Sequence, residues 1–97
     1  MAKVVYTRRA LDDLAARFSF LAKESEAAAL EALRVIQSAI ATLEDHPFIG
    51  RAVDGNLREL VVSFGHTGYI ALYRFLPAQD LVRVLGVRHQ RELGRGL

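Results

Sequence analysis

Two short turns in the second half of the chain constrain its fold more than any other feature. Residues 57–64, 69–76 and 81–89 are rich in β-branched, aromatic and other apolar side chains, and each stretch predicts a strand. Only residues 65–68 and 77–80 separate them. A parallel crossover needs about a dozen residues or more, so successive strands must run antiparallel. The second half of the chain therefore predicts a β-meander.

The first half predicts one short strand and two helices. Residues 3–7 favour a strand, and Thr7 can cap a helix over 8–23, where apolar residues recur at helical spacing. Ser25 can cap a second helix over 26–45. Pro47 ends that helix, because the residue before a proline avoids the α conformation. The short link makes the two helices an antiparallel hairpin.

The element order β-α-α-β-β-β predicts an α+β fold, with a helical hairpin packed on one face of a small, mainly antiparallel sheet. A chain of 97 residues fits a single domain, 1–97. Gly50 and residues 54–56 predict a loop between the second helix and the meander. The polar, glycine-bearing tail over 90–97 is expected to be flexible.

Alternation along the last two predicted strands places apolar side chains on both faces of the sheet. One side of the strand over 69–76 carries Tyr69, Ala71, Tyr73 and Phe75, and the other carries Ile70, Leu72 and Arg74. In the strand over 81–89, alternation groups Arg83 with Leu85 and Val87, and Arg88 with Val82 and Val84. One helical layer cannot cover both faces. The spare apolar surface therefore either meets a partner or is covered by the chain itself.

Charge is distributed unevenly along the chain. Residues 1–47 carry six basic and seven acidic side chains, whereas residues 48–97 carry seven basic and four acidic ones. All seven basic residues of the second half are arginines. Arginine forks suit carboxylate or phosphate partners, which favours a basic patch facing nucleic acid or an acidic protein segment. An arginine-rich but ordinary surface, as a high-GC genome encodes, is the alternative.

Several classes of site and location are disfavoured. The chain has no cysteine, which excludes disulfides, thiolate metal sites and a cysteine nucleophile. Its three histidines are dispersed without metal-ligand spacing, so we expect neither a metal nor another cofactor. A mean hydropathy of +0.16 argues against disorder. With no long charge-free stretch and no signal-peptide pattern at its start, the chain is expected to be cytoplasmic, without a membrane partner.

Short motifs along nearly the whole chain resemble the RelE/ParE superfamily of bacterial type II toxin–antitoxin toxins. They are the opening over 5–14, His46-Pro47 with Gly50-Arg51, Leu57-Arg58-Glu59-Leu60, Gly68-Tyr69, Leu72-Tyr73-Arg74 and the last strand with its extension over 87–92. The resemblance implies a compact toxin held inactive by a cognate antitoxin. The antitoxin would wrap an extended, partly helical segment around the toxin. The toxin itself would not bind DNA strongly.

The superfamily divides by target, and the resemblance can be tested residue by residue. RelE-like members cleave mRNA on the ribosome, whereas ParE-like members inhibit DNA gyrase and so DNA replication. The resemblance implies that the nucleases carry two lysines where this chain has Val61 and Ser63, and an arginine where it has Ile70. They also carry a terminal tyrosine, or histidine and tyrosine, where it has residues 95–97.

These departures favour the ParE-like branch, a gyrase inhibitor that makes no bond changes. A RelE-like, ribosome-dependent mRNA endonuclease is the alternative. A third hypothesis is a decayed toxin, or an interaction module that only binds its antitoxin.

No residue is a firm catalytic candidate. If the chain is a nuclease, His89 beside Arg88 would serve as general acid or base; otherwise His89 is structural or contacts a partner. Arg58 forms either an ion pair with Glu59 or a partner contact. Arg74 lies among apolar residues and is expected to pair with a carboxylate, from this chain or the antitoxin. The residues expected to contact the target or the antitoxin are Arg58, Arg74, Arg83, Arg88, His89 and Arg91.

Overall fold

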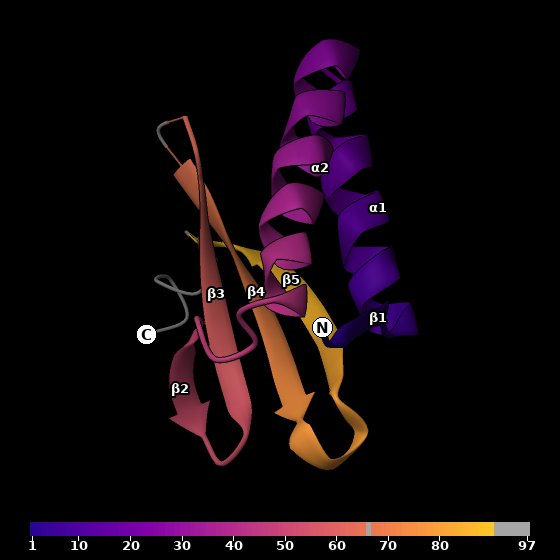
Figure 1. Cartoon of the computed structure of the whole chain (residues 1–97). Coiled ribbons are helices and arrows are strands. Elements are labelled where there is room, and N and C mark those ends of the chain that lie inside the picture. Colours follow the sequence, from indigo (N-terminus) through magenta and orange to yellow (C-terminus); the bar gives the residue numbers. More distant parts are fainter. Residues whose placement is uncertain (66, 91–97) are drawn as a thin grey trace.

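The computed structural model describes residues 1–65 and 67–90, in which two helices pack on one five-stranded sheet (Figure 1). The helices are α1 (Arg8–Ala22) and α2 (Glu26–Ala41), and the strands are β1 (Lys3–Tyr6), β2 (Arg51–Asp54), β3 (Leu57–Phe64), β4 (Thr67–Leu76) and β5 (Leu81–His89). The strand order is β1-β5-β4-β3-β2; β1 runs parallel to β5, and the other neighbours are antiparallel. The predicted α+β fold is confirmed. The expected flexible tail lies, apart from Gln90, outside the described residues.

Element boundaries differ from the prediction at several places. The second helix ends at Ala41 and continues as a 3-10 turn, Thr42–Glu44. β4 begins at Thr67, two residues earlier than expected. The predicted loop before the meander contains an additional strand, β2, so that prediction was wrong. All four residues of β2 are exposed, so it lacks the apolar alternation by which sequence reveals a strand.

Both predicted helix caps are confirmed. The Thr7 hydroxyl accepts a hydrogen bond from the Ala10 N–H at 3.1 Å, and it also donates to the Leu85 carbonyl of β5 at 3.3 Å. The Ser25 hydroxyl accepts from the Ala28 N–H at 3.1 Å. Each bond satisfies a backbone donor that the first turn of a helix leaves without a partner. Thr7 in addition ties the start of α1 to the sheet.

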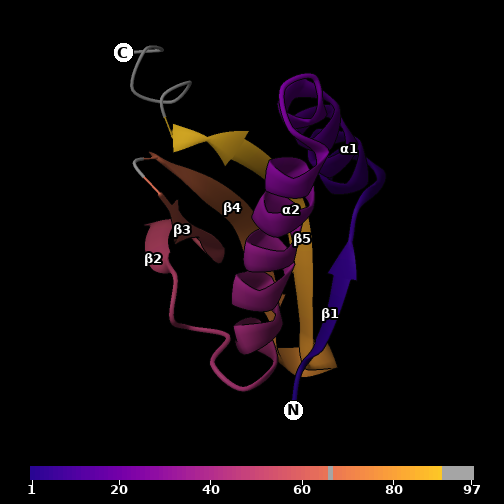
Figure 2. The same cartoon turned by 90° about the horizontal axis from the view of Figure 1, so that it is seen from above.

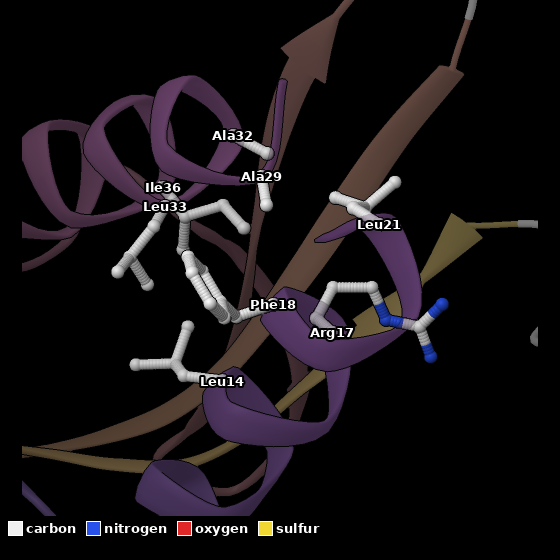
Figure 3. Close-up of a pocket in the computed structure, with 8 residues that line it drawn as sticks. All are labelled: Leu14, Arg17, Phe18, Leu21, Ala29, Ala32, Leu33 and Ile36. Carbon is white, nitrogen blue, oxygen red and sulfur yellow. The ribbon is translucent and has the colours of Figure 1, made fainter. Parts of the chain in front are cut away.

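The two helices pack through a closed apolar crease (Figure 3). Figure 3 shows Leu14 and Phe18 of α1 pointing toward Leu33 and Ile36 of α2, while the Arg17 guanidinium points away from this group. Small residues of α2 permit the close approach, and the crease between the helices holds no water-sized space. Neither described helix is long and apolar enough to cross a membrane.

Both helices cover the same face of the sheet (Figure 2), and the core lies between these two layers. The buried side chains that β3, β4 and β5 contribute to this face are Val62, Tyr69, Ala71, Tyr73, Phe75, Val82, Val84 and Val87. Val4 and Tyr6 of β1 pack at its edge. This arrangement confirms the predicted hairpin on one sheet face.

A bulge in β5 changes which of its side chains share a face. Tyr73 pairs with Val84 and Leu72 pairs with Gly86, so Leu85 is an extra residue without a partner on β4. The alternation expected from sequence was therefore wrong beyond Leu85. Val87 joins Val82 and Val84 on the helix-covered face, whereas Arg88 joins Arg83 on the opposite face.

The opposite face of the sheet, called the open face below, carries no helix in the described part of the chain. Its half-buried aliphatic residues are Val5, Leu57, Leu72, Leu76 and Leu81. Its basic residues are Lys3, Arg51, Arg74, Arg83 and Arg88. The structure thus has the second, partly apolar sheet face that the sequence predicted.

Candidate functional site

Val61 and Ile70 lie in one row across the open face. The resemblance implies that the nucleases carry a lysine and an arginine at these two positions. Val61 of β3 pairs with Ile70 of β4, which pairs with Arg88 of β5. Ser63 lies two residues along β3, opposite Gly68. Val61 is 56% exposed, whereas Ile70 is only 8% exposed. The structure therefore brings these positions together, and within the row Arg88 alone carries a charge.

Arg88 and His89 lie on opposite faces of the sheet. Arg88 is on the open face, whereas His89 pairs with Tyr69 on the helix-covered face. The His89 Nε2 atom lies 2.5 Å from the Thr67 hydroxyl, and its ring meets the Tyr69 ring edge to face at 5.4 Å. The two candidates for a nuclease site therefore do not converge on one substrate atom.

Arg74 and Arg83 lie directly opposite each other on the open face, on the adjacent strands β4 and β5. Arg83 is exposed and Arg74 is half-buried. An Arg74 N–H donates to the side-chain oxygen of Asn56 at 2.5 Å. This oxygen belongs to an amide, so within the described residues the expected carboxylate partner of Arg74 is not found.

Arg58 supports a loop of the chain itself. Its guanidinium donates to the carbonyls of Gly50 at 2.7 Å and Phe48 at 3.2 Å, and it lies 5.0 Å from the centre of the Phe48 ring. The considered ion pair with Glu59 does not form, because Glu59 pairs with Arg51 across β2 and β3. Arg91, the remaining expected contact residue, lies outside the described residues.

Sequence reasoning missed the part that Tyr73 plays in the same loop. Its hydroxyl accepts a hydrogen bond from the Gly50 N–H at 2.9 Å and donates to the Pro47 carbonyl at 2.8 Å. Burial raises the pKa of Tyr73, against the opposing influence of the Gly50 N–H and the Arg58 charge. The loop presents Phe48 and Ile49, each more than half exposed. The signal in the sequence was Gly50 soon after Pro47.

The site contains no acidic or histidine cluster suited to a metal ion. Within residues 1–65 and 67–90, no three His, Cys, Asp or Glu side chains lie close enough together to hold one. On the open face, the arginines can bind anionic groups and the aliphatic side chains can contact apolar ones.

Comparison with known sequences identifies one family over most of the chain. Residues 4–94 match the family described as "ParE toxin of type II toxin-antitoxin system, parDE". Two curated relatives come from Caulobacter vibrioides. Toxin RelE3 is 37% identical over 92 residues, covering 95% of this chain and 98% of the relative. Toxin RelE2 is 34% identical over 93 residues, covering 96% of this chain and all of the relative.

Solved structures share the fold at lower identity. The chain is similar to a protein of the chromosomal ParDE toxin–antitoxin system from P. aeruginosa, with a TM-score of 0.72 and 19% identity over 92% of this chain and 96% of that one. It is also similar to a chain of the intact E. coli RelBE toxin–antitoxin complex, with a TM-score of 0.61 and 13% identity over 91% and 95%. Matches to both ParE and RelE names show one common toxin fold.

Proposed function

Because the chain belongs to the ParE toxin family of type II toxin–antitoxin systems, we propose that it inhibits growth by binding DNA gyrase, and not by cleaving RNA. The proposal makes the chain a poison whose surface contacts stall an essential enzyme and interrupt DNA replication. A cognate antitoxin neutralises the toxin by binding to it and covering its surface. The encounter with gyrase takes place in the cytoplasm and needs no cofactor or membrane.

The row of Val61, Ile70 and Arg88 on the open face carries this proposal. RNA cleavage needs a base for the 2′-hydroxyl, an acid for the leaving oxygen and cations for the phosphate. Valine and isoleucine supply none of these. One arginine can bind a phosphate, but it stays protonated at physiological pH and cannot exchange a proton. The row favours binding over catalysis.

The names of the two curated relatives favour a second candidate function. Both are called RelE toxins, which makes an mRNA endonuclease acting on the ribosome the alternative. Such an enzyme would use His89 as its acid or base and Arg88 as its phosphate ligand. The structure supports this candidate less well, because the two side chains lie on opposite faces of the sheet.

Supercoiling and cleavage assays with purified DNA gyrase test the proposal. We expect the purified toxin to inhibit supercoiling or to accumulate cleaved DNA, and the co-purified antitoxin to reverse the effect. The same preparation should leave mRNA on programmed ribosomes intact. If gyrase stays fully active at a large excess of toxin while ribosome-bound mRNA is cut, the endonuclease replaces the gyrase poison as the function.

A further inference from the structure

We propose that Arg74 and Arg83 form a carboxylate-binding site on the open face, and that its occupant is an acidic, amphipathic segment of a partner protein. The inference rests on the proposed function only in taking the antitoxin as the source of that segment. It assigns to the antitoxin both Arg74, expected from the sequence to pair with a carboxylate, and Arg83, which the sequence had favoured as part of a target-facing patch with Arg88 and Arg91.

Arg74 and Arg83 repel each other in these positions. They are direct cross-strand partners, and like charges in this position destabilise a sheet. Arg83 is exposed, so its guanidinium is accessible from the open face. Arg74 is anchored by the Asn56 side chain, which orients the guanidinium without neutralising it. A bound carboxylate between the two strands would remove the repulsion and accept hydrogen bonds from both forks.

The described chain supplies no carboxylate for this position. The carboxylates whose strand positions match the open face are Asp54 and Glu59. Glu59 is occupied by its ion pair with Arg51. Asp54 lies in the same cross-strand row as Arg74, but Leu57 stands between them. Two strand spacings separate Asp54 from Arg74 by about 10 Å. Residues 91–97 contain two arginines and one glutamate, so this segment of the sequence is not acidic either.

Aliphatic side chains surround the arginine pair and indicate a protein occupant. Leu57 and Val5 flank the pair in the same row, and Leu72 and Leu76 lie two residues to either side of Arg74. Each of these is half-buried and so retains surface for a partner to cover. A nucleic-acid backbone offers phosphates but no aliphatic groups between them. A peptide segment that alternates acidic and apolar residues offers both, at the spacing of this sheet.

Calorimetric titration of the purified chain with a synthetic peptide tests the site. The peptide has eight residues alternating leucine and glutamate, and its control carries glutamine in place of glutamate. We expect the glutamate peptide to bind, and Arg83→Glu to weaken it by about tenfold or more, since a charge-assisted hydrogen bond and its charge are lost. Arg9→Glu, a matched reversal at an exposed position on α1, should leave binding close to wild type.

Thermal unfolding of the same proteins provides the folding control. Arg83→Glu replaces a repulsive cross-strand pair with an attractive one, so its unfolding midpoint should equal or exceed that of the wild type. Equal affinity for the two peptides, no binding of either peptide, or undiminished binding by Arg83→Glu would each overturn the proposal.

A single-stranded oligonucleotide of equal charge distinguishes the phosphate alternative. If the oligonucleotide binds more tightly than the glutamate peptide and competes with it, the site belongs to nucleic acid and the protein occupant is excluded. The titrations contain no gyrase, so failure here leaves the gyrase proposal standing, and a negative gyrase assay leaves this site unaffected.

Discussion

Gly50 shows how one residue without a side chain organises a loop. A Cβ atom at this position would lie 2.6 Å from the Tyr73 hydroxyl oxygen and 2.8 Å from the Glu59 carbonyl oxygen, closer than real contacts allow. Because that space is kept free, the Gly50 N–H reaches the Tyr73 hydroxyl and its carbonyl reaches Arg58. The exposed Phe48 and Ile49 are thereby held on a backbone whose polar groups already have partners within the protein.

Replacing Tyr73 with phenylalanine should therefore destabilise the fold. The change removes the acceptor of the buried Gly50 N–H and the donor to the Pro47 carbonyl, and an unsatisfied buried group costs about 1–3 kcal/mol. Urea denaturation measures the free energy of unfolding. Tyr6→Phe is the matched control, because Tyr6 is half-buried and its hydroxyl has no hydrogen bond within the described residues. Equal losses in the two variants would show that the loop bonds contribute nothing.

The tyrosines also predict how stability depends on alkaline pH. Burial raises the pKa values of Tyr6, Tyr69 and Tyr73 above the ordinary value of about 10. The folded state then holds these protons more tightly than the unfolded state does, so their contribution is fully present below about pH 10. It is lost as the pH rises through the folded pKa values.

Unfolding temperatures recorded between neutral pH and about pH 11 should stay level and then fall above about pH 10. Absorbance titration of the phenolates provides the second measurement. The tyrosines of the folded chain should ionise at higher pH than those of the chain in urea. Coincident titration curves in the two states would rule out this explanation of any alkaline instability.

Among the elements, the bulged strand β5 is hydrogen-bonded to helix α1. The Val87 N–H donates to the Asp13 carboxylate of α1 at 2.9 Å, in the part of β5 that extends beyond its pairing with β1. A Cβ atom at Gly86 would lie 3.0 Å from the same carboxylate, so this residue too accommodates the contact. Asp13 thereby holds α1 to β5 just after the bulge at Leu85.

Asp13→Ala should destabilise the chain more than any exposed acidic substitution on the same helix. It leaves the Val87 N–H without its acceptor, at a cost of about 1–3 kcal/mol. Asp12→Ala, at the exposed neighbouring position, should change stability by no more than about 0.5 kcal/mol. Amide hydrogen exchange at Val87 checks the mechanism: exchange should accelerate in Asp13→Ala, and unchanged protection would remove Asp13 from this role.

Features that depend on a few neighbouring residues could be predicted from the sequence, whereas features that depend on contacts between distant residues could not. The caps at Thr7 and Ser25 follow from residue type and position, and both form as expected. The β5 bulge lies next to a contact with Asp13, more than seventy residues earlier in the chain, and local alternation does not reveal it. Alternation alone therefore assigned Val87 and Arg88 to the wrong faces. β2 was missed because its exposed residues carry no apolar pattern.

At the scale of the whole molecule, the sequence predicted the two layers and the second, partly apolar sheet face. It did not predict which candidate residues lie on that face. The hydrophobic periodicity and the turn lengths are signals carried by a few neighbouring residues, so they could be recognised in the sequence and predicted the two layers. Arg88 and His89 are neighbours in one strand, so alternation alone places them on opposite faces, but which of the two lies on the open face depends on the bulge in β5. Arg58, expected at a partner, supports a loop, whereas Arg83 stays exposed.

The two candidate functions differ in what His89→Ala does to growth inhibition. For a poison that acts by surface contact, cells expressing His89→Ala should stop growing nearly as the wild type does. Loss of a general acid or base from a nuclease would instead reduce activity by about 10²–10⁴-fold. Colony counts after induction measure the difference. Circular dichroism confirms folding, since His89 contacts Thr67 and Tyr69. Abolished toxicity in a folded variant would contradict the gyrase proposal.

The pairing of β1 with β5 has a consequence for the newly made chain. The first strand finds its neighbour in the last one, with Lys3 beside Leu81 and Tyr6 beside Val84. Synthesis proceeds from the N-terminus, so β1 has no strand partner until β5 has left the ribosome. A nascent chain therefore lacks the complete five-stranded sheet. Until β1 and β5 pair, a nascent chain offers neither a target nor an antitoxin the complete open face.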